Sequence, residues 1–181
     1  MRRTLPLLAA VLLAGCGSVD AKPIEPAQPA EPQRAELGWS ENHVAAGKGQ
    51  LVFAVTSLAV TADGWSADVA VTNRTGYRFE VDTGPAGYGF GLMLLPTGDQ
   101  KTVEELNREG LLPAIRRART IEPPPPAMLR PGATWRGTLA APGSLADGSW
   151  VRVVFGTFRG QGDVPEEFVR VVWFTDHSHR L

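Results

Sequence analysis

The sequence predicts a mainly β protein whose larger part is an antiparallel β-sandwich of about seven strands with one short inserted helix. From Trp39 onward, stretches rich in Val, Phe and Trp recur about every 8–15 residues between turns that contain Gly, Pro, Asn or Asp. Several of these stretches alternate apolar and polar residues, as half-buried strands do. Only one segment, near residue 100, carries helix signals.

The first strands are marked by their turns. Leu51–Val60 is apolar, and Asp63-Gly64 after it is a hairpin signal. Residues 65–72 then alternate Trp, Ala, Val and Val with smaller or polar residues, which predicts a strand with one buried face. We expect two shorter strands to follow, at Tyr77–Val81 and Phe90–Leu95.

The helix is expected just after residue 100. Thr102 and Glu105 have the spacing of a capping box, which predicts that Thr102 caps the helix. Gly110 can end it. The run Pro123–Pro126 excludes regular helix and central strand further on.

Three strands are expected to finish the domain: Thr134–Ala140, Ser149–Phe158 and Phe168–Thr175. The last two are apolar at both odd and even positions, as Val151, Val153 and Phe155 against Trp150 and Val154 show. Strands that are apolar on both faces tend to be central or covered.

The N-terminus has the parts of an export signal in order. Arg2 and Arg3 are followed by the apolar run Leu5–Leu13, which is too short to span a bilayer. Leu13-Ala14-Gly15-Cys16 then resembles the lipobox of bacterial lipoproteins, whose cysteine is lipidated and becomes the first residue of the mature chain. The alternatives are a plain secretory signal or a structural cysteine.

This resemblance implies an organisation and a location. Residues 1–15 would be the signal peptide, 16–38 a lipidated cysteine and a disordered Pro-rich tether, and 39–181 the sandwich domain. The lipid on Cys16 would hold the protein on the extracytoplasmic side of the cell membrane, or at the outer membrane if the cell has one. Covalent lipid aside, no cofactor is expected.

The strand number and rhythm of residues 39–181 also resemble Ig-like sandwich domains of exported bacterial proteins. The Cys…Trp…Cys core of true immunoglobulin domains is absent, since the chain has one cysteine. A function as a non-enzymatic binding or scaffold domain is therefore expected, with another envelope protein or a cell-wall component as its partner.

Two alternative functions rest on short motifs. Asp176, His177 and His179 are candidate ligands for Zn or Cu, because residues two apart share a face of a strand. Glu122 and the prolines Pro123, Pro124, Pro125 and Pro126 form a stiff loop that could enter a protease cleft, which would make the domain an inhibitor.

The charge of the chain and its short motifs bear on three further functions: nucleic-acid binding, hydrolysis and binding of an anionic surface. With 18 Lys+Arg against 19 Asp+Glu, the net charge of −1 argues against nucleic acid as a partner. The chain has no Gly-x-Ser-x-Gly, and the single Asp82-Thr83-Gly84 is weak support for a hydrolase. Four arginines around the helix offer either a patch for anionic lipid or polymer or a solvated face: Arg108, Arg116, Arg117 and Arg119.

Overall fold

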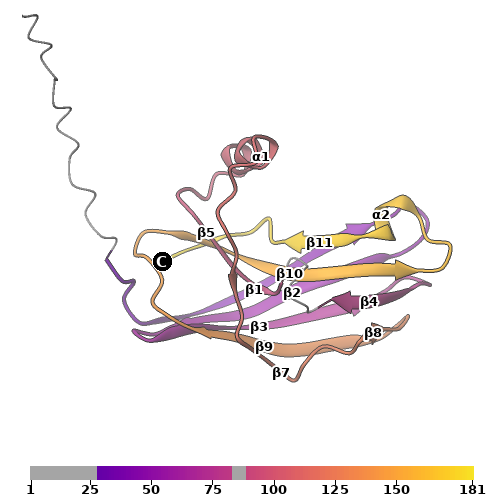
Figure 1. The fold of residues 1–181 in the computed structure, drawn as a ribbon, viewed down its shortest axis with the longest axis horizontal. Helices are drawn as coiled ribbons and strands as arrows, with labels where there is room; N and C mark the ends of the chain where they lie inside the picture. The colour runs from indigo at the N-terminus through magenta and orange to yellow at the C-terminus, as the bar shows by residue number, and fades with distance from the viewer. Residues whose placement is uncertain (1–27, 83–88) are drawn as a thin grey trace, which may run out of the picture.

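The computed structural model describes residues 28–82 and 89–181, and it confirms an antiparallel β-sandwich with little helix. Two sheets lie face to face (Figure 1). The five-stranded sheet has the order β1 (Gln33–Val44), β2 (Gln50–Val60), β3 (Gly64–Asn73), β9 (Thr134–Pro142), β7 (Thr120–Glu122). The seven-stranded sheet contains β6 (Arg116–Arg117), β5 (Gly91–Leu95), β10 (Trp150–Gln161), β4 (Arg78–Asp82), β8 (Met128–Leu129), β11 (Val171–Phe174) and β12 (His179–Arg180).

Strand β10 is the centre of the seven-stranded sheet. One of its edges pairs with β5 and then β4, and the other pairs with β12 and then β11. Val154, for example, lies between Gly91 of β5 and Phe174 of β11. Strand β10 is apolar on both faces, as the sequence indicated, because both faces are covered: Phe155 lies in the core between the sheets and Val154 in a second apolar cluster on the other side.

Aromatic side chains fill the space between the sheets. Phe53 of β2 contacts Phe155 and Phe158 of β10, with ring centroids 5.1 and 5.6 Å apart. Phe79 and Phe168 extend this contact in an edge-to-face pair at 5.6 Å. All five rings are almost completely buried, so the core holds without a disulfide.

The folded unit begins earlier than the expected boundary at Trp39. Strand β1 starts at Gln33, and its side chains alternate between more and less exposed positions. Ahead of it, the Ala30 amide donates to the Leu145 carbonyl at 2.7 Å, and Ala30 is buried. Residues 28–38, which were expected to belong to the tether over 16–38, are therefore part of the domain. Cys16 lies outside the described residues.

The inserted helix forms where the sequence placed it, but its cap is a different residue. Helix α1 spans Gln100–Arg108, and the carboxylate of Asp99 accepts from both the amide and the hydroxyl of Thr102. Thr102 is thus inside the first turn, and an aspartate three residues earlier caps it. Gly110, at φ 69°, follows the helix end as expected.

The last expected strand is shorter than Phe168–Thr175. Phe168 belongs instead to a one-turn helix, α2 (Glu166–Val169), and its ring lies in the core. Strand β11 begins only at Val171. Four two- or three-residue strands were not expected, because so few residues carry no period: β6, β7, β8 and β12.

Candidate binding cleft

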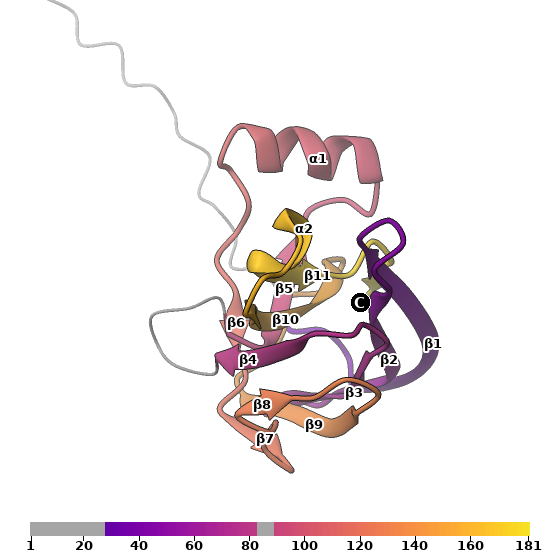
Figure 2. The same cartoon turned by 90° about the vertical axis from the view of Figure 1, so that its right-hand side faces the viewer.

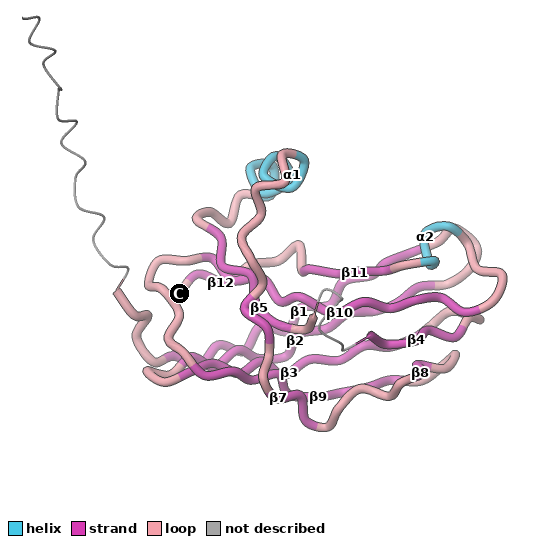
Figure 3. Tube along the Cα trace, in the orientation of Figure 1, coloured by secondary structure: helices cyan, strands magenta, loops and turns pink. Residues whose placement is uncertain are grey.

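The outer face of the seven-stranded sheet is apolar where sandwich sheets are usually polar. Met93 and Leu95 of β5, Val154 of β10 and Phe174 of β11 form a second apolar cluster, separate from the core between the sheets. Residues 96–117, which we call the arm, cross this face, with α1 standing above the sheet (Figures 2 and 3).

Few contacts hold the arm to the sheet. Val103 is the one buried side chain of α1, and Leu111 just after the helix is 61% exposed. At its far end the arm pairs through β6 with Gly91 and Leu92 of β5. The Arg116 guanidinium also donates to the Ser144 carbonyl at 2.9 Å.

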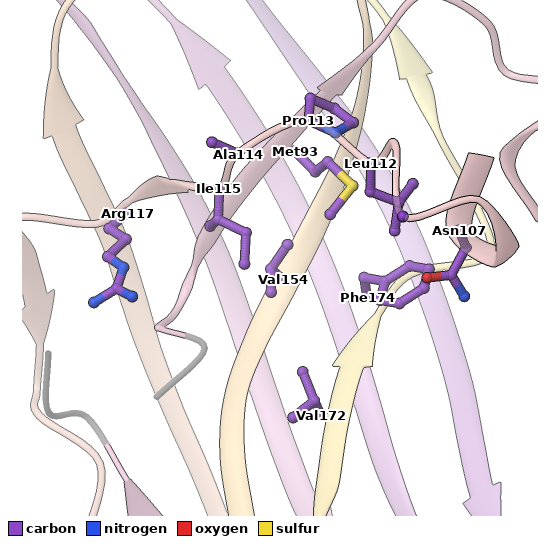
Figure 4. Close-up of a pocket in the computed structure, with 11 residues that line it drawn as sticks. Met93, Asn107, Leu112, Pro113, Ala114, Ile115, Arg117, Val154, Val172 and Phe174 are labelled. Carbon is purple, nitrogen blue, oxygen red and sulfur yellow. The ribbon is translucent and has the colours of Figure 1, made fainter. Parts of the chain in front are cut away.

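A cleft of about 700 Å³ remains between the arm and the sheet. This volume lies within the range of sites that hold small molecules, roughly 300–1,000 Å³. Sheet residues form the floor of the cleft: Met93, Val154, Val172 and Phe174. Arm residues form the roof: Leu112, Pro113, Ala114 and Ile115 (Figure 4).

The two ends of the cleft are polar. Asn107 of α1 lies at one end and Arg117 of β6 at the other, with the apolar lining between them (Figure 4). The Arg117 side chain packs closely against Gly89, where a Cβ would lie 3.3 Å from Arg117 Cδ. Among the described residues that line the cleft, none is Ser, Cys, His, Asp or Glu.

A buried arginine lies under α1, on the same face of β10 as Val154. Arg152 has no exposed surface, and its Nη2 donates to Gln100 Oε1 at 2.6 Å. Its Nε and Nη1 have no hydrogen-bond partner within residues 28–82 and 89–181. Burial lowers the pKa of Arg152, and the carboxylates of Asp176, Glu41 and Glu104 oppose that effect.

Glu41 joins the two sheets at the corner where the chain ends. Its buried carboxylate accepts from Trp173 Nε1 at 2.8 Å, from the amides of Asp176 and His177, and from His177 Nδ1 at 2.7 Å. Burial alone would raise the pKa of Glu41, but these hydrogen bonds together lower it below the ordinary 4.5. Trp39 stacks on the His177 ring, 5.8 Å between centroids.

The structure gives the two candidate metal-ligand histidines separate partners. His177 bonds Glu41, whereas His179 Nε2 lies 3.1 Å from Gln33 Oε1. Asp176 lines a small hollow with Gln100 and His177. Within the described residues, no group of three or more His, Cys, Asp or Glu side chains is placed to hold a metal ion.

The proline loop lies away from the cleft, between β7 and β8. Glu122 ends β7, and the loop from Pro123 to Pro126 is largely exposed. Trp135 Nε1 donates to the Pro123 carbonyl at 3.1 Å, and the Ala127 carbonyl accepts from the Val81 amide, so both ends are pinned. The inhibitor alternative stays a prediction.

Comparison with protein-family models, curated proteins and solved structures gives no significant match for this chain. In the part of the chain that the structure describes, no helix is long and apolar enough to cross a membrane. Of the Asp82-Thr83-Gly84 motif, only Asp82 is described, and it pairs with Arg159.

Sequence reasoning did not assemble the cleft residues into a site. Its one available signal was the double-faced apolar pattern of β10, which required a cover over the outer face. The cover is the inserted helix and its flanking loops.

Proposed function

We propose that this protein is a lipid-anchored envelope lipoprotein whose sandwich domain binds, without catalysis, a ligand with an apolar part. The cleft between the arm and the outer sheet face carries the proposal. An apolar face covered by a thinly attached segment is suited to take up a ligand, because the arm can adjust without disturbing the core between the sheets.

The anchor rests on the order of N-terminal features. A basic pair, a short apolar run and Leu13-Ala14-Gly15-Cys16 precede the folded unit, and Cys16 is the one cysteine of the chain. Two or three acyl chains on Cys16 would hold the domain stably at the extracytoplasmic face of the membrane. The ligand would then come from the envelope, as part of another envelope protein, a cell-wall component or a lipid.

The lining favours binding over catalysis. Apolar side chains form the floor and roof, and the polar groups at the two ends, Asn107 and Arg117, are suited to orient a ligand. A small number of polar groups at the ends of an apolar surface is typical of binding sites for small molecules.

In-cell photo-crosslinking tests the binding site. A benzophenone amino acid at Ile115, which faces the cleft floor from the arm, should trap a ligand, whereas the same group at exposed Ala127, at the end of the proline loop, should not. Adducts at both positions in equal amount, or at neither, would contradict the cleft as the binding site.

A separate experiment tests the anchor. Cys16→Ser should leave the precursor unlipidated and uncut after Gly15, and the protein should lose the acyl mass seen by mass spectrometry. Normal processing of this variant would refute the anchor while leaving the cleft proposal standing.

A further inference from the structure

We propose that the ligand of the cleft is a single-chain anionic amphiphile, with its hydrocarbon chain between the arm and the sheet and its head group at Arg117. This inference rests on the proposed function, since it names the ligand class of the same cleft. Three features of the described residues support it: the shape of the apolar surface, the placement of Arg117, and the charge around it.

The apolar surface is one continuous strip. Val154 and Met93 lie diagonally to each other in the floor, on neighbouring strands, since Val154 pairs with Gly91 and Met93 with Arg152, and Phe174 of β11 pairs with Val154 on its other side. Leu112 and Ile115 face this floor from the arm (Figure 4). A strip with apolar walls on two sides removes a flexible hydrocarbon chain from water along its length.

Arg117 is held at one end of the strip. It belongs to β6, which pairs with Gly91 and Leu92, so its backbone is fixed to the sheet edge. Its side chain passes Gly89, where a Cβ would crowd it. A guanidinium is a strong partner for a carboxylate or a phosphate, because it presents several N–H donors in one plane.

The charge at this end favours an anion. Arg119 is also exposed, and Arg116, whose guanidinium donates to the Ser144 carbonyl, is a third positive charge next to Arg117 in the chain. The acidic side chains of the arm lie on α1 or next to its ends, on the side of the cleft where Asn107 lies, and they outnumber the two basic side chains there, Lys101 and Arg108: Asp99, Glu104, Glu105 and Glu109. An anionic head group therefore has a preferred end, and the ligand one orientation.

The test compares two probes with the same chain. The lipidated full chain in neutral phosphatidylcholine nanodiscs is offered a diazirine fatty acid, at a pH where its carboxylate is ionised, or the matching fatty alcohol. Labelled peptides are mapped by mass spectrometry. We expect both probes to label the cleft floor and roof, with the acid labelling roughly tenfold more, since it gains a charge-assisted hydrogen bond.

Substitutions in the protein test separately the role of Arg117 and that of the apolar cleft. Arg117→Gln should reduce labelling by the acid to the level of the alcohol, and Arg117→Lys should keep most of the preference. Arg136→Gln, on the exposed side of β9, is the charge-matched control and should change nothing. Ile115→Trp, which places a larger ring between the arm and the floor, should abolish labelling by both probes, whereas Ala127→Trp should not.

The outcomes separate the two proposals. Equal labelling by acid and alcohol, unaffected by Arg117→Gln, would overturn the anionic head group and leave the binding cleft. Absence of labelling in the cleft by any probe, together with protein-sized adducts from Ile115 in cells, would overturn the amphiphile in favour of a protein segment. A diazirine lysophosphatidic acid that labels more than the fatty acid would support the inference and identify the head group as a phosphate.

Discussion

The two faces of the seven-stranded sheet are both apolar, but they are covered in different ways. The inner face meets a second sheet through interlocking aromatic rings, such as Phe53 against Phe155. The outer face meets an arm whose helix buries one side chain, Val103, and it contains Arg152, two of whose nitrogens have no partner in the described part of the chain. The inner face thus supplies the stability of the fold, and the outer face supplies a surface that can open.

The largest loss of stability should come from a substitution on the inner face of the seven-stranded sheet. Phe155→Ala removes a fully buried ring between the sheets and should lower the free energy of unfolding by about 3–5 kcal/mol. Met93→Ala, on the outer face beside the open cleft, should cost less, about 2 kcal/mol. Urea denaturation measures both, and an equal loss for the two variants would erase the difference between the faces.

The second-largest loss of stability should come from Glu41, which joins the two sheets at one corner. Glu41→Gln replaces a carboxylate that accepts four hydrogen bonds by an amide whose NH₂ group faces donors, and should cost about 2–3 kcal/mol near neutral pH. The matched control is Glu36→Gln on the same strand, which is exposed and should change stability by less than about 0.5 kcal/mol.

Acid should remove the advantage of Glu41. Because its folded-state pKa is lowered below 4.5, its carboxylate stabilises the fold above that value, and this contribution is lost as the pH falls through the folded-state pKa. The stability difference between wild type and Glu41→Gln should therefore shrink between about pH 5 and about pH 2 in urea titrations. A difference that stays constant over this range would refute the assignment.

Replacing the buried Arg152 should raise the stability of the fold, whereas the substitutions above lower it. Arg152→Met exchanges a poorly paired buried charge for an apolar side chain of similar length, and should raise the free energy of unfolding by about 1–2 kcal/mol. Arg136→Met on the exposed side of β9 serves as the control. Destabilisation by Arg152→Met would mean that its charge is well paired after all and that the outer face is not the weaker one.

The smallest global effect should come from the arm itself. Val103→Ala should lower the free energy of unfolding by about 1 kcal/mol, while amide hydrogen exchange in 100–110 speeds up roughly fivefold and that of β10 is unchanged. Equal acceleration in the arm and in β10 would show that the two form one cooperative unit. Val169→Ala, at an exposed position, should leave both unaffected.

Much of the fold was predictable because the long strands carry a period. Alternation over 65–72 and the turn Asp63-Gly64 place β3, and the double-faced pattern of 149–158 places β10. Strand β1 was not predicted, because the preceding prolines suggested a tether up to residue 38 and Glu36 and Gly38 interrupt the apolar signal. Short strands such as β6 exist only because β5 is there to pair with them.

The site was harder to predict because its parts lie far apart in the chain. Met93, Ile115, Val154 and Phe174 come together only through the pairing of three strands and the path of the arm. The histidines show the same limit, because their partners in the structure, Glu41 and Gln33 of β1, lie over a hundred residues away in the chain.

The loop at Ala146–Ser149 receives both ends of the folded chain. The Asp147 amide donates to the Gln28 carbonyl, and the Leu181 amide donates to the Ser149 carbonyl. A short linker could therefore join residues 181 and 28, and the chain could be opened instead at the Ala45–Gly49 turn at the other end of β1 (Figure 1). A circular permutant of this kind would keep every strand pair, and the domain could equally be inserted into a surface loop of a host protein.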